Sequence, residues 1–291
     1  MPKKPLRKVV FPAAGMGTRF LPATKAIPKE MLTIVDKPLI QYGVEESLAS
    51  SMDEILIITG RGKNTIEDHF DISAELERNL LAVGKEKMFK KISRISRMAN
   101  IAYVRQKQAL GLGHAVLCAA PWIGDEPFGV QLADELILGK EPAMQQLRTV
   151  HEATGASVIG LVEVASSDVH KYGIVKAKQE GDLLRLDSMI EKPSADYAPS
   201  NLAIVGRYIF TPTLFEKLKD TKPSINGEIQ LTDAMNQLAH EEAVYGVVLT
   251  GQRFDAGNPE GFLAANAILG LQHPDYAPAL TLLLANILAK N

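Results

Sequence analysis

The residues best suited to chemistry lie near the start of the chain, in the segment Ala13-Ala14-Gly15-Met16-Gly17-Thr18-Arg19. Two glycines at this spacing, directly after a short apolar strand, let backbone N–H groups approach an anion closely. Arg19, Lys25 and Lys29 follow within a stretch that two prolines stiffen. Arginine offers a planar fork of donors and lysine a point charge, so we interpret the segment as a binding site for a polyphosphate.

Two common nucleotide-binding motifs do not fit this segment. The dinucleotide fingerprint needs a third glycine where Phe20 stands, and the Gly-Lys-Ser/Thr of the P-loop is missing. The plain alternative is a solvated basic turn, which is the common interpretation of an isolated cluster of cations. The buried strand and the two glycines directly before the cations favour the phosphate site.

Two aspartates are candidates for holding a metal ion. Asp134 follows the apolar strand 128–132, and Asp255 lies in Arg253-Phe254-Asp255-Ala256-Gly257. Carboxylates at the carboxyl ends of central strands point into the ligand crevice of open α/β sheets, although a lone aspartate is often only a turn residue. Two such oxygen ligands, with phosphate oxygens and water, would satisfy octahedral Mg²⁺.

Other polar residues are weaker candidates. Gln106 is by itself an ordinary polar residue at a strand end, whose amide can both donate and accept hydrogen bonds. We expect nearby His114 to pack or cap rather than catalyse. A pair such as Glu191-Lys192 is usually a salt-bridged surface. Gly227 to Ala234 indicates a helix start with acids in its first turn, and we do not assign Asp233 to catalysis.

Composition narrows the function classes. The chain has 291 residues, 46% apolar and 23% charged, with a net charge of −2, so it has no excess of basic residues to attract nucleic acid or an anionic membrane. Its one cysteine, Cys118, lies in an apolar stretch and excludes an intrachain disulfide, which suits the cytoplasm. We expect no secretory signal, because the first apolar run breaks at Pro12. The apolar tail 277–289 is too short to span a bilayer.

Alternating strands and helices must position these residues in the first half. Apolar runs predict strands at 8–14, 54–59, 101–104, 128–132 and 156–164. Helical periodicity predicts helices at 39–51, 64–70, within 74–98, 113–120 and 142–154. This alternation predicts an α/β fold of Rossmann-like type, with a mixed, mostly parallel central sheet and helices on both faces.

The second half has a different pattern. Residues 172–178, 183–190 and 202–210 alternate like antiparallel strands. Helices are expected at 213–219, 228–241, 259–272 and 278–289, with a strand at 244–249. No repeat or low-complexity linker interrupts the chain. We therefore expect a single α/β domain over 1–291, with a small antiparallel portion and C-terminal helices.

At this point a family resemblance emerges. The segment from Phe11 to Lys25, then Pro28-Lys29-Glu30-Met31-Leu32 and Asp36 to Tyr42, resembles bacterial UTP–glucose-1-phosphate uridylyltransferases, the UDP-glucose pyrophosphorylases of the sugar-phosphate nucleotidylyltransferase superfamily. Related thymidylyl, cytidylyl and adenylyl enzymes usually have Gly-Gly where this chain has Ala13-Ala14. The resemblance runs from about residue 8 to about 270, so it covers most of the chain.

The resemblance implies transfer of a uridylyl group from UTP to glucose 1-phosphate with Mg²⁺. It implies a nucleotide-binding half at about 8–165, a sugar-phosphate-binding half at about 166–258 and C-terminal helices at about 259–291. The implied residues are, for the nucleotide, Ala13, Ala14, Gly15, Gly17, Thr18, Gln106 and Gly111; for the sugar phosphate, Gly173, Glu191 and Lys192; for catalysis, Arg19, Lys29 and Lys192; and for the metal, Asp134 and Asp255.

One position departs from the family pattern. Relatives often have two adjacent aspartates where this chain has Asp134-Glu135. Mg²⁺ demands short, near-ideal octahedral distances, so a longer second acid would disturb direct coordination. We therefore expect Glu135 not to bind the metal directly. It would act through a water, cap the strand end or be a solvated side chain.

Alternative functions stay open on the sequence alone. A sister enzyme would use dTTP or another sugar 1-phosphate. A non-catalytic regulator on the same fold should have lost Arg19, Lys29 or Asp134, all of which are present. A glycosyltransferase would usually carry an Asp-x-Asp motif, which Asp134-Glu135-Leu136 is not. The apolar residues of the last two expected helices must pack on the core or on another subunit, so we expect a homo-oligomer, a dimer or a tetramer.

Overall fold

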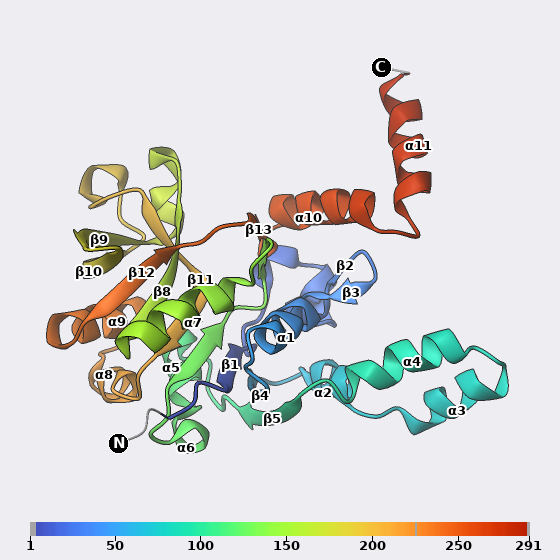
Figure 1. Ribbon diagram of the computed structural model, residues 1–291, viewed down its shortest axis with the longest axis horizontal. Coiled ribbons are helices and arrows are strands. Elements are labelled where there is room, and N and C mark those ends of the chain that lie inside the picture. The colour runs from blue at the N-terminus through green and yellow to red at the C-terminus, as the bar shows by residue number, and fades with distance from the viewer. Residues whose placement is uncertain (1–3, 225, 290–291) are drawn as a thin grey trace.

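A computed structural model describes residues 4–224 and 226–289. Its centre is a nine-stranded sheet with the order β5-β4-β1-β6-β11-β8-β12-β10-β9 (Figure 1). The strands are β1 Lys8–Pro12, β4 Glu54–Thr59, β5 Asn100–Arg105, β6 Phe128–Gln131, β8 Ser157–Glu163, β9 Gly173–Glu180, β10 Leu183–Glu191, β11 Leu202–Phe210 and β12 Val244–Val248. Each of these strands was expected from the sequence, with ends that agree within two residues.

The sheet is mixed, as expected, and the strands expected to be antiparallel at 172–178, 183–190 and 202–210 are antiparallel, but the sheet as a whole is not mostly parallel. Strands β5, β4, β1 and β6 are parallel. In the other half of the sheet, β11 is antiparallel to β6 and to β8, and β10 is antiparallel to β12 and to β9. Strands β8 and β12 are parallel to each other. For β9 and β10 the reason is connection length, because they are joined by a tight turn at Gly181, with φ of +61°, which only an antiparallel pair permits.

Helices cover both faces of the sheet, as expected. Alternate residues of β1 belong to different cores: Val9 and Phe11 pack with α1 (Leu39–Ala49) and α7 (Ala143–Thr154). Val10 packs on the other face, in the core that contains residues of α5 (Gly111–Leu117), α6 (Ala120–Ile123), α8 (Leu214–Asp220) and α9 (Leu231–Glu241). This two-residue alternation is what a strand buried on both faces requires.

Two small ribbons were not expected from the sequence. Strand β7 (Glu135–Leu138) pairs antiparallel with β13 (Gln252–Asp255), and β2 (Thr33–Ile34) pairs with β3 (Lys37–Pro38). The first ribbon sets Asp255 opposite Glu135. It thereby joins segments that lie more than 110 residues apart in the chain. Short strands of this kind give too few residues for a periodic sequence signal.

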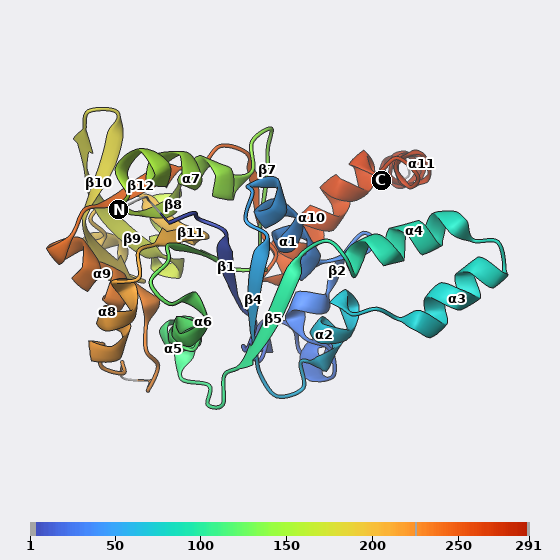
Figure 2. The ribbon, with the colours of Figure 1, turned by 60° about the horizontal axis from the view of Figure 1, so that its bottom comes forward.

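Several helix boundaries also differ from the expectation, and the helix expected at 113–120 ends at Leu117 and is followed by the separate α6. The helix expected at 228–241 begins at Leu231, so the Glu228 segment before it is a loop. The helix-prone stretch 74–98 forms two helices, α3 (Ala74–Ala82) and α4 (Glu86–Ile95), separated at Gly84, where φ is +72°. With α2 (Asn64–Phe70), they form an arm that extends away from the sheet in both ribbon views (Figure 2).

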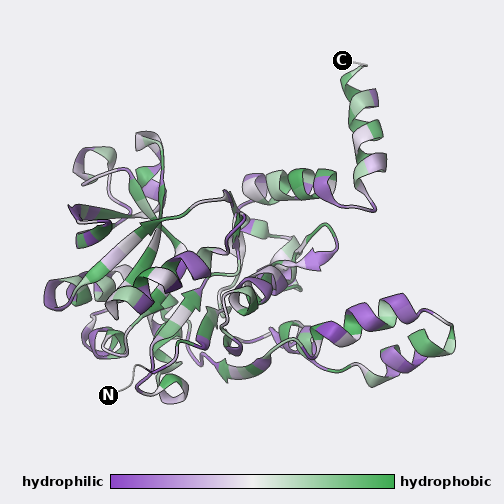
Figure 3. Cartoon of the chain, in the orientation of Figure 1, coloured by the Kyte–Doolittle hydropathy of each residue, from purple (hydrophilic) through white to green (hydrophobic). Residues whose placement is uncertain are grey.

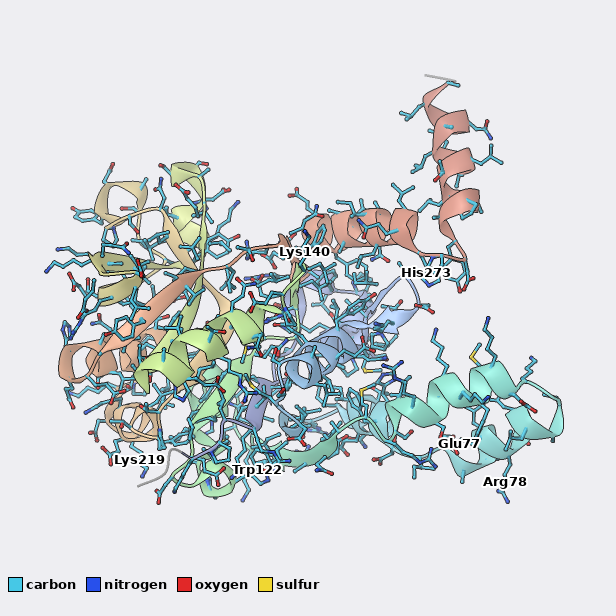
Figure 4. The ribbon with its side chains drawn as sticks, in the orientation of Figure 1. Glu77, Arg78, Trp122, Lys140, Lys219 and His273 are labelled. Carbon is cyan, nitrogen blue, oxygen red and sulfur yellow. The ribbon has the colours of Figure 1, made fainter. Side chains whose placement is uncertain are left out.

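The chain ends in α10 (Pro259–Gln272) and α11 (Ala277–Leu288). Helix α11 extends beyond α10 away from the sheet (Figure 1), and Figure 4 marks His273 at the turn between them, with Glu77 and Arg78 on α3. None of the residues of α11 is buried, although the helix is largely apolar (Figure 3). Within the described residues, no helix combines the length and the apolarity needed to cross a membrane.

Candidate active site

The carboxyl ends of the parallel strands bring the predicted site residues to one edge of the sheet. Strands β1 and β6 are neighbours, so the loop after Pro12 lies beside the loop that carries Asp134. Strand β5 delivers Gln106 to the same edge. A cavity of about 530 Å³ lies there, lined by Pro12, Ala14, Gly15, Met16, Gly17, Thr18, Arg19, Phe20, Lys29, Gln106, Ala109, Gly111, Leu112, Ala115, Leu132, Asp134, Glu191, Lys192, Glu228, Gln230 and Gly257. This is the crevice position at which open α/β sheets bind ligands.

The two glycines of the phosphate segment have different structural reasons. Gly17 has a φ of +67°, and a Cβ there would lie 3.2 Å from Cβ of Lys29, so the backbone shape and the packing both favour glycine. Gly15 has an ordinary φ, and a Cβ there would meet no described atom within 4 Å. Nothing in the protein therefore explains a glycine at position 15, whereas a ligand that needs close backbone approach would.

Two residues predicted from this segment do not line the cavity. Ala13 is buried, and its N–H group donates to the carbonyl of Ile58 at 2.9 Å. Lys25 is exposed and lies outside the cavity lining. The cations that do line the cavity are Arg19, Lys29 and Lys192.

Lys29 and Asp134 form an ion pair inside the cavity. Nζ of Lys29 donates to Oδ2 of Asp134 at 2.6 Å, with the side chains 25% and 17% exposed. Burial by itself would lower the pKa of Lys29 and raise that of Asp134. The mutual attraction outweighs burial and holds the Lys29 pKa above, and the Asp134 pKa below, its ordinary value. Both groups are therefore charged at neutral pH.

The two predicted metal ligands lie close together, across Gly257. A Cβ built on Gly257 would lie 2.7 Å from Oδ2 of Asp134 and 3.1 Å from Oδ1 of Asp255, so both oxygens border the same small space. A side chain at position 257 would fill that space. Hard carboxylate oxygens around a gap kept open by glycine fit Mg²⁺ with further ligands from substrate and water. Within the described residues, no group of three His, Cys, Asp or Glu side chains could hold a metal alone.

Behind Asp134, a buried arginine supports the loop. Arg207 is 1% exposed and donates to the carbonyls of Leu132 and Glu135, on either side of Asp134, at 3.1 and 2.7 Å. Its other donors make a two-bond ion pair with Glu46 of α1, at 2.8 and 2.7 Å. Sequence reasoning missed Arg207, because a lone arginine in an apolar strand gives no chemical pattern. Its isolation in the run Leu202 to Phe210 was the signal available.

Glu135 has a role that none of the sequence-based alternatives described. It forms a two-bond ion pair with Arg253 at 2.8 and 2.7 Å, across the β7–β13 ribbon. The Arg253 guanidinium also lies 5.0 Å from the ring centre of Tyr172 and donates to its hydroxyl at 3.3 Å. Glu135 is therefore a largely buried, paired side chain, neither solvated nor a strand cap. Through Arg253 it links the strand carrying Asp255 to the segment before Gly173.

On the side of the cavity next to α5, the Gln106 amide contacts two residues. It is 8% exposed, and its Nε2 lies 3.1 Å from the carbonyl oxygen of Gly111 and 2.9 Å from Nδ1 of His114. Gly111 has a φ of +90°, and a Cβ there would come within 2.8 Å of Glu228. The loop before α9 closes this side, because the backbone of Ile229 exchanges hydrogen bonds with Leu110 and Gly113. That loop was expected to be only the start of a helix.

On the opposite side, β9 and β10 carry the predicted sugar-phosphate residues. Gly173 is paired directly with Glu191, and its Cβ position would lie 3.3 Å from Oε2 of Glu191. Gly173 itself does not line the cavity, whereas Glu191 and Lys192 do. Thr232, another residue missed from the sequence, donates to Oε2 of Glu191 at 2.7 Å. Lys192 has an unusual φ of +46°, and its N–H donates to the carbonyl of Tyr172 at 2.9 Å.

Comparison with known proteins places the chain in a family. The sequence profile of the nucleotidyl transferase family matches residues 8–270. Across nearly its full length the chain is similar to curated UTP–glucose-1-phosphate uridylyltransferases. The chain belongs to this family. Among relatives in it, a Bacillus subtilis uridylyltransferase, YngB, is 47% identical over 289 residues, 99% of this chain and 97% of the relative. A Pseudomonas aeruginosa uridylyltransferase is 48% identical over 263 residues, 89% and 94% of the two chains.

Solved structures of uridylyltransferases share the fold. A UDP-glucose pyrophosphorylase in complex with UDP-glucose has a TM-score of 0.85 and 44% identity, covering 92% of this chain and 100% of the other. A UTP-bound enzyme from Acinetobacter baumannii has a TM-score of 0.90 and 37% identity, covering 96% and 99%. The family resemblance inferred for about residues 8–270 is thereby confirmed.

Proposed function

We propose that this chain transfers the uridylyl group of UTP to α-D-glucose 1-phosphate, giving UDP-glucose and pyrophosphate. A phosphate oxygen of the sugar phosphate attacks the α-phosphorus of UTP. The bond from that phosphorus to the bridging oxygen breaks, and its electron pair leaves with pyrophosphate. The attacking oxygen is already anionic, so the reaction needs positioning and charge neutralisation rather than an activated side-chain nucleophile.

The observation that carries the proposal is that one cavity has three parts, suited to a triphosphate, a base and a sugar phosphate. Ala14, Gly15, Gly17 and Thr18 line the cavity, and their backbone N–H groups bind the triphosphate. Ala13 supports them from behind, because its N–H group is bonded to the neighbouring strand. Arg19 and Lys29 neutralise the charge that develops on the leaving pyrophosphate. Gln106 and Gly111 read the base.

Across the cavity, Glu191 binds a sugar hydroxyl, and Lys192 holds the phosphate of the attacking sugar. Gly173 lets the backbone approach the sugar. The hydrogen bond from Thr232 fixes one carboxylate oxygen of Glu191 and leaves Oε1 near Lys192, at 3.4 Å. The two substrates would therefore enter from opposite sides and meet beside Asp134.

We assign the metal to Asp134 and Asp255 and its identity to Mg²⁺. The support is the donor set of hard carboxylate oxygens and the gap at Gly257 that a Cβ would fill. When bound, the ion would neutralise phosphate charge and orient the α-phosphate. The contribution of the chain is to keep Asp134 charged through Lys29, and to hold the two carboxylates close together through Arg207 and the β7–β13 ribbon.

The cellular setting and assembly form part of the same proposal. We place the enzyme in the cytoplasm. It forms one domain, in which the nucleotide half (about 8–165) and the sugar-phosphate half (about 166–258) share a sheet. Nucleic acid and membrane have no part in the reaction. The exposed apolar residues of α11, with Leu282 at 64% and Leu288 at 75%, support a homo-oligomer built partly by the C-terminal helices, about 259–291.

A substrate panel tests the reaction directly. The purified protein with Mg²⁺ is mixed with each of UTP, dTTP, CTP and ATP, and with glucose 1-phosphate or galactose 1-phosphate, and pyrophosphate release is measured. We expect UTP with glucose 1-phosphate to react fastest and EDTA to stop the reaction. Equal or faster turnover with dTTP or ATP would contradict the uridylyl assignment. No turnover with any pair, from a folded protein, would favour a non-catalytic regulator.

A further inference from the structure

The Gln106 amide can be oriented without ambiguity. Its Nε2 lies 3.1 Å from the Gly111 carbonyl oxygen, which can only accept a hydrogen bond, so the nitrogen must be the atom that faces it. The same nitrogen lies 2.9 Å from Nδ1 of His114. Since both protons of the amide then point to Gly111 and His114, Nδ1 of His114 must accept. The neutral ring therefore carries its proton on Nε2.

The opposite atom of the amide is left for a ligand. Oε1 of Gln106 receives no hydrogen bond from any described residue, and it is not completely buried. Because Gln106 lines the cavity, this oxygen is available to a molecule bound there. Beside it, the N–H groups of Gly111 and Leu112 open the first turn of α5 and donate to no described acceptor. The protein thus presents one acceptor next to N–H donors.

This order of donors and acceptors distinguishes pyrimidines. Uracil offers a donor at N3 and an acceptor at O4, which match the Oε1 acceptor and the backbone donors. Cytosine offers an acceptor at N3 and a donor at N4, the reverse order. A free glutamine could turn its amide over and donate to N3 of cytosine. With the amide turned, however, Oε1 would face the carbonyl oxygen of Gly111, a repulsive arrangement, and His114 could donate to it only after moving its proton from Nε2 to Nδ1.

We propose that His114 is a specificity-determining positioning residue, which holds Gln106 with its oxygen toward the base and so rejects cytosine nucleotides. This proposal rests on the proposed function, because it assumes that the base of a nucleoside triphosphate occupies this side of the cavity. It assigns to His114 a task that neither packing nor helix capping would require. His114 acts through Gln106 and does not touch the reacting atoms.

Two substitutions at position 114 separate this role from a structural one. His114→Leu keeps the approximate volume but removes the acceptor. His114→Asn keeps an acceptor, Oδ1, close to the position of Nδ1. His240→Ala, at an exposed histidine of α9, is the matched control. For each protein, kcat/KM is measured with UTP and with CTP.

We expect His114→Leu to lower the UTP-to-CTP ratio of kcat/KM about tenfold, roughly the value of one hydrogen bond. His114→Asn should stay within about twofold of wild type, and His240→Ala should not change the ratio. An unchanged ratio in His114→Leu, or an equal fall in His114→Leu and His114→Asn, would overturn the inference. A wild type that uses UTP and CTP equally would instead contradict the proposed function.

A measurement on the wild-type protein covers the case in which His114→Leu does not fold. Nitrogen-15 NMR of the histidine rings reports which ring nitrogen carries the proton, and His114→Asn identifies the His114 signals. We expect the Nε2–H tautomer at neutral pH without any nucleotide. A ring protonated on Nδ1 could not accept from Gln106 and would overturn the inference, whatever the substrate preference.

Discussion

Nζ of Lys29 lies 2.6 Å from Oδ2 of Asp134, although 105 residues separate the two in the chain. A proposed phosphate-binding cation and a proposed metal ligand are thus each other's partner in the free protein. Glu30, the neighbour of Lys29, is buried and paired with Lys63 at 2.8 Å, which anchors the short helical turn Lys29–Met31. The charges proposed to take part in catalysis are therefore held in position, and balanced, in the free protein.

Asp134→Asn keeps the shape of the side chain and removes its charge. We expect kcat and kcat/KM to fall together by about 100-fold or more, because the lost charge stabilises mainly the transition state. Steady-state kinetics over a range of Mg²⁺ concentrations measures the effect. Asp125→Asn, at an aspartate that is 93% exposed and outside the cavity, is the control. Near-normal activity of Asp134→Asn at low Mg²⁺ would show that Asp134 is not a metal ligand.

Gly15 and Gly17 give a matched pair of substitutions. Gly17→Ala forces a side chain into left-handed backbone against Lys29 and Thr24, so we expect a loss of about 1–2 kcal/mol in the free energy of unfolding. Gly15→Ala meets no protein atom, so we expect unchanged stability but weaker UTP binding. Urea unfolding and UTP titration measure the two effects. The assignment of Gly15 to the triphosphate fails if Gly15→Ala binds UTP normally.

The Glu135–Arg253 pair predicts a pH dependence with a definite sign. Burial raises the pKa of Glu135 to about 7 in the folded protein, despite the ion pair with Arg253, from an ordinary value of 4.5. The folded state then holds this proton more tightly than the unfolded state. The resulting stability is complete below about pH 4.5 and is lost as the pH rises through about 7.

Glu135→Gln removes this titration and isolates its effect. Relative to Glu135→Gln, we expect the wild type to lose free energy of unfolding between pH 4.5 and 7. Urea unfolding of both proteins across this range measures the difference, with Glu141→Gln as the control at an exposed glutamate. If the free energy of unfolding of the wild type instead rises relative to that of Glu135→Gln as the pH rises, the attraction of Arg253 lowers the pKa of Glu135 more than burial raises it.

The apolar surface of α11 predicts assembly. Leu283 is 55% exposed on a helix with no buried residue, so Leu283→Glu should barely affect the monomer. We expect Leu283→Glu to shift a dimer or tetramer toward monomer, as measured by light scattering coupled to gel filtration. Asn286→Asp on the same helix adds one charge at a polar position and serves as the control. A wild type that stays monomeric at all concentrations would refute the assembly.

The sequence by itself determined the strands of the central sheet, most of the helices and the family. Runs such as Glu54 to Thr59 are apolar over a strand length and need no partner to be recognised. The phosphate segment could be interpreted for the same reason, because glycine spacing and nearby cations are local properties. Lys29, Asp134 and Gln106 were therefore found before their positions were known.

Only the tertiary structure decided which of these residues meet. Asp134 and Asp255 come together because the short β7 and β13 strands pair, and pairing register between segments so far apart leaves no local pattern. The pairing of Glu135 with Arg253 and of Glu191 with Thr232 could not be predicted for the same reason. The antiparallel strands of the second half were expected, but the order in which they join the sheet was undetermined, since apolar runs do not encode which strands become neighbours. His114 shows the difference best: its residue type was visible, but its hydrogen bond with Gln106 depends on a helix turning back beside a strand end.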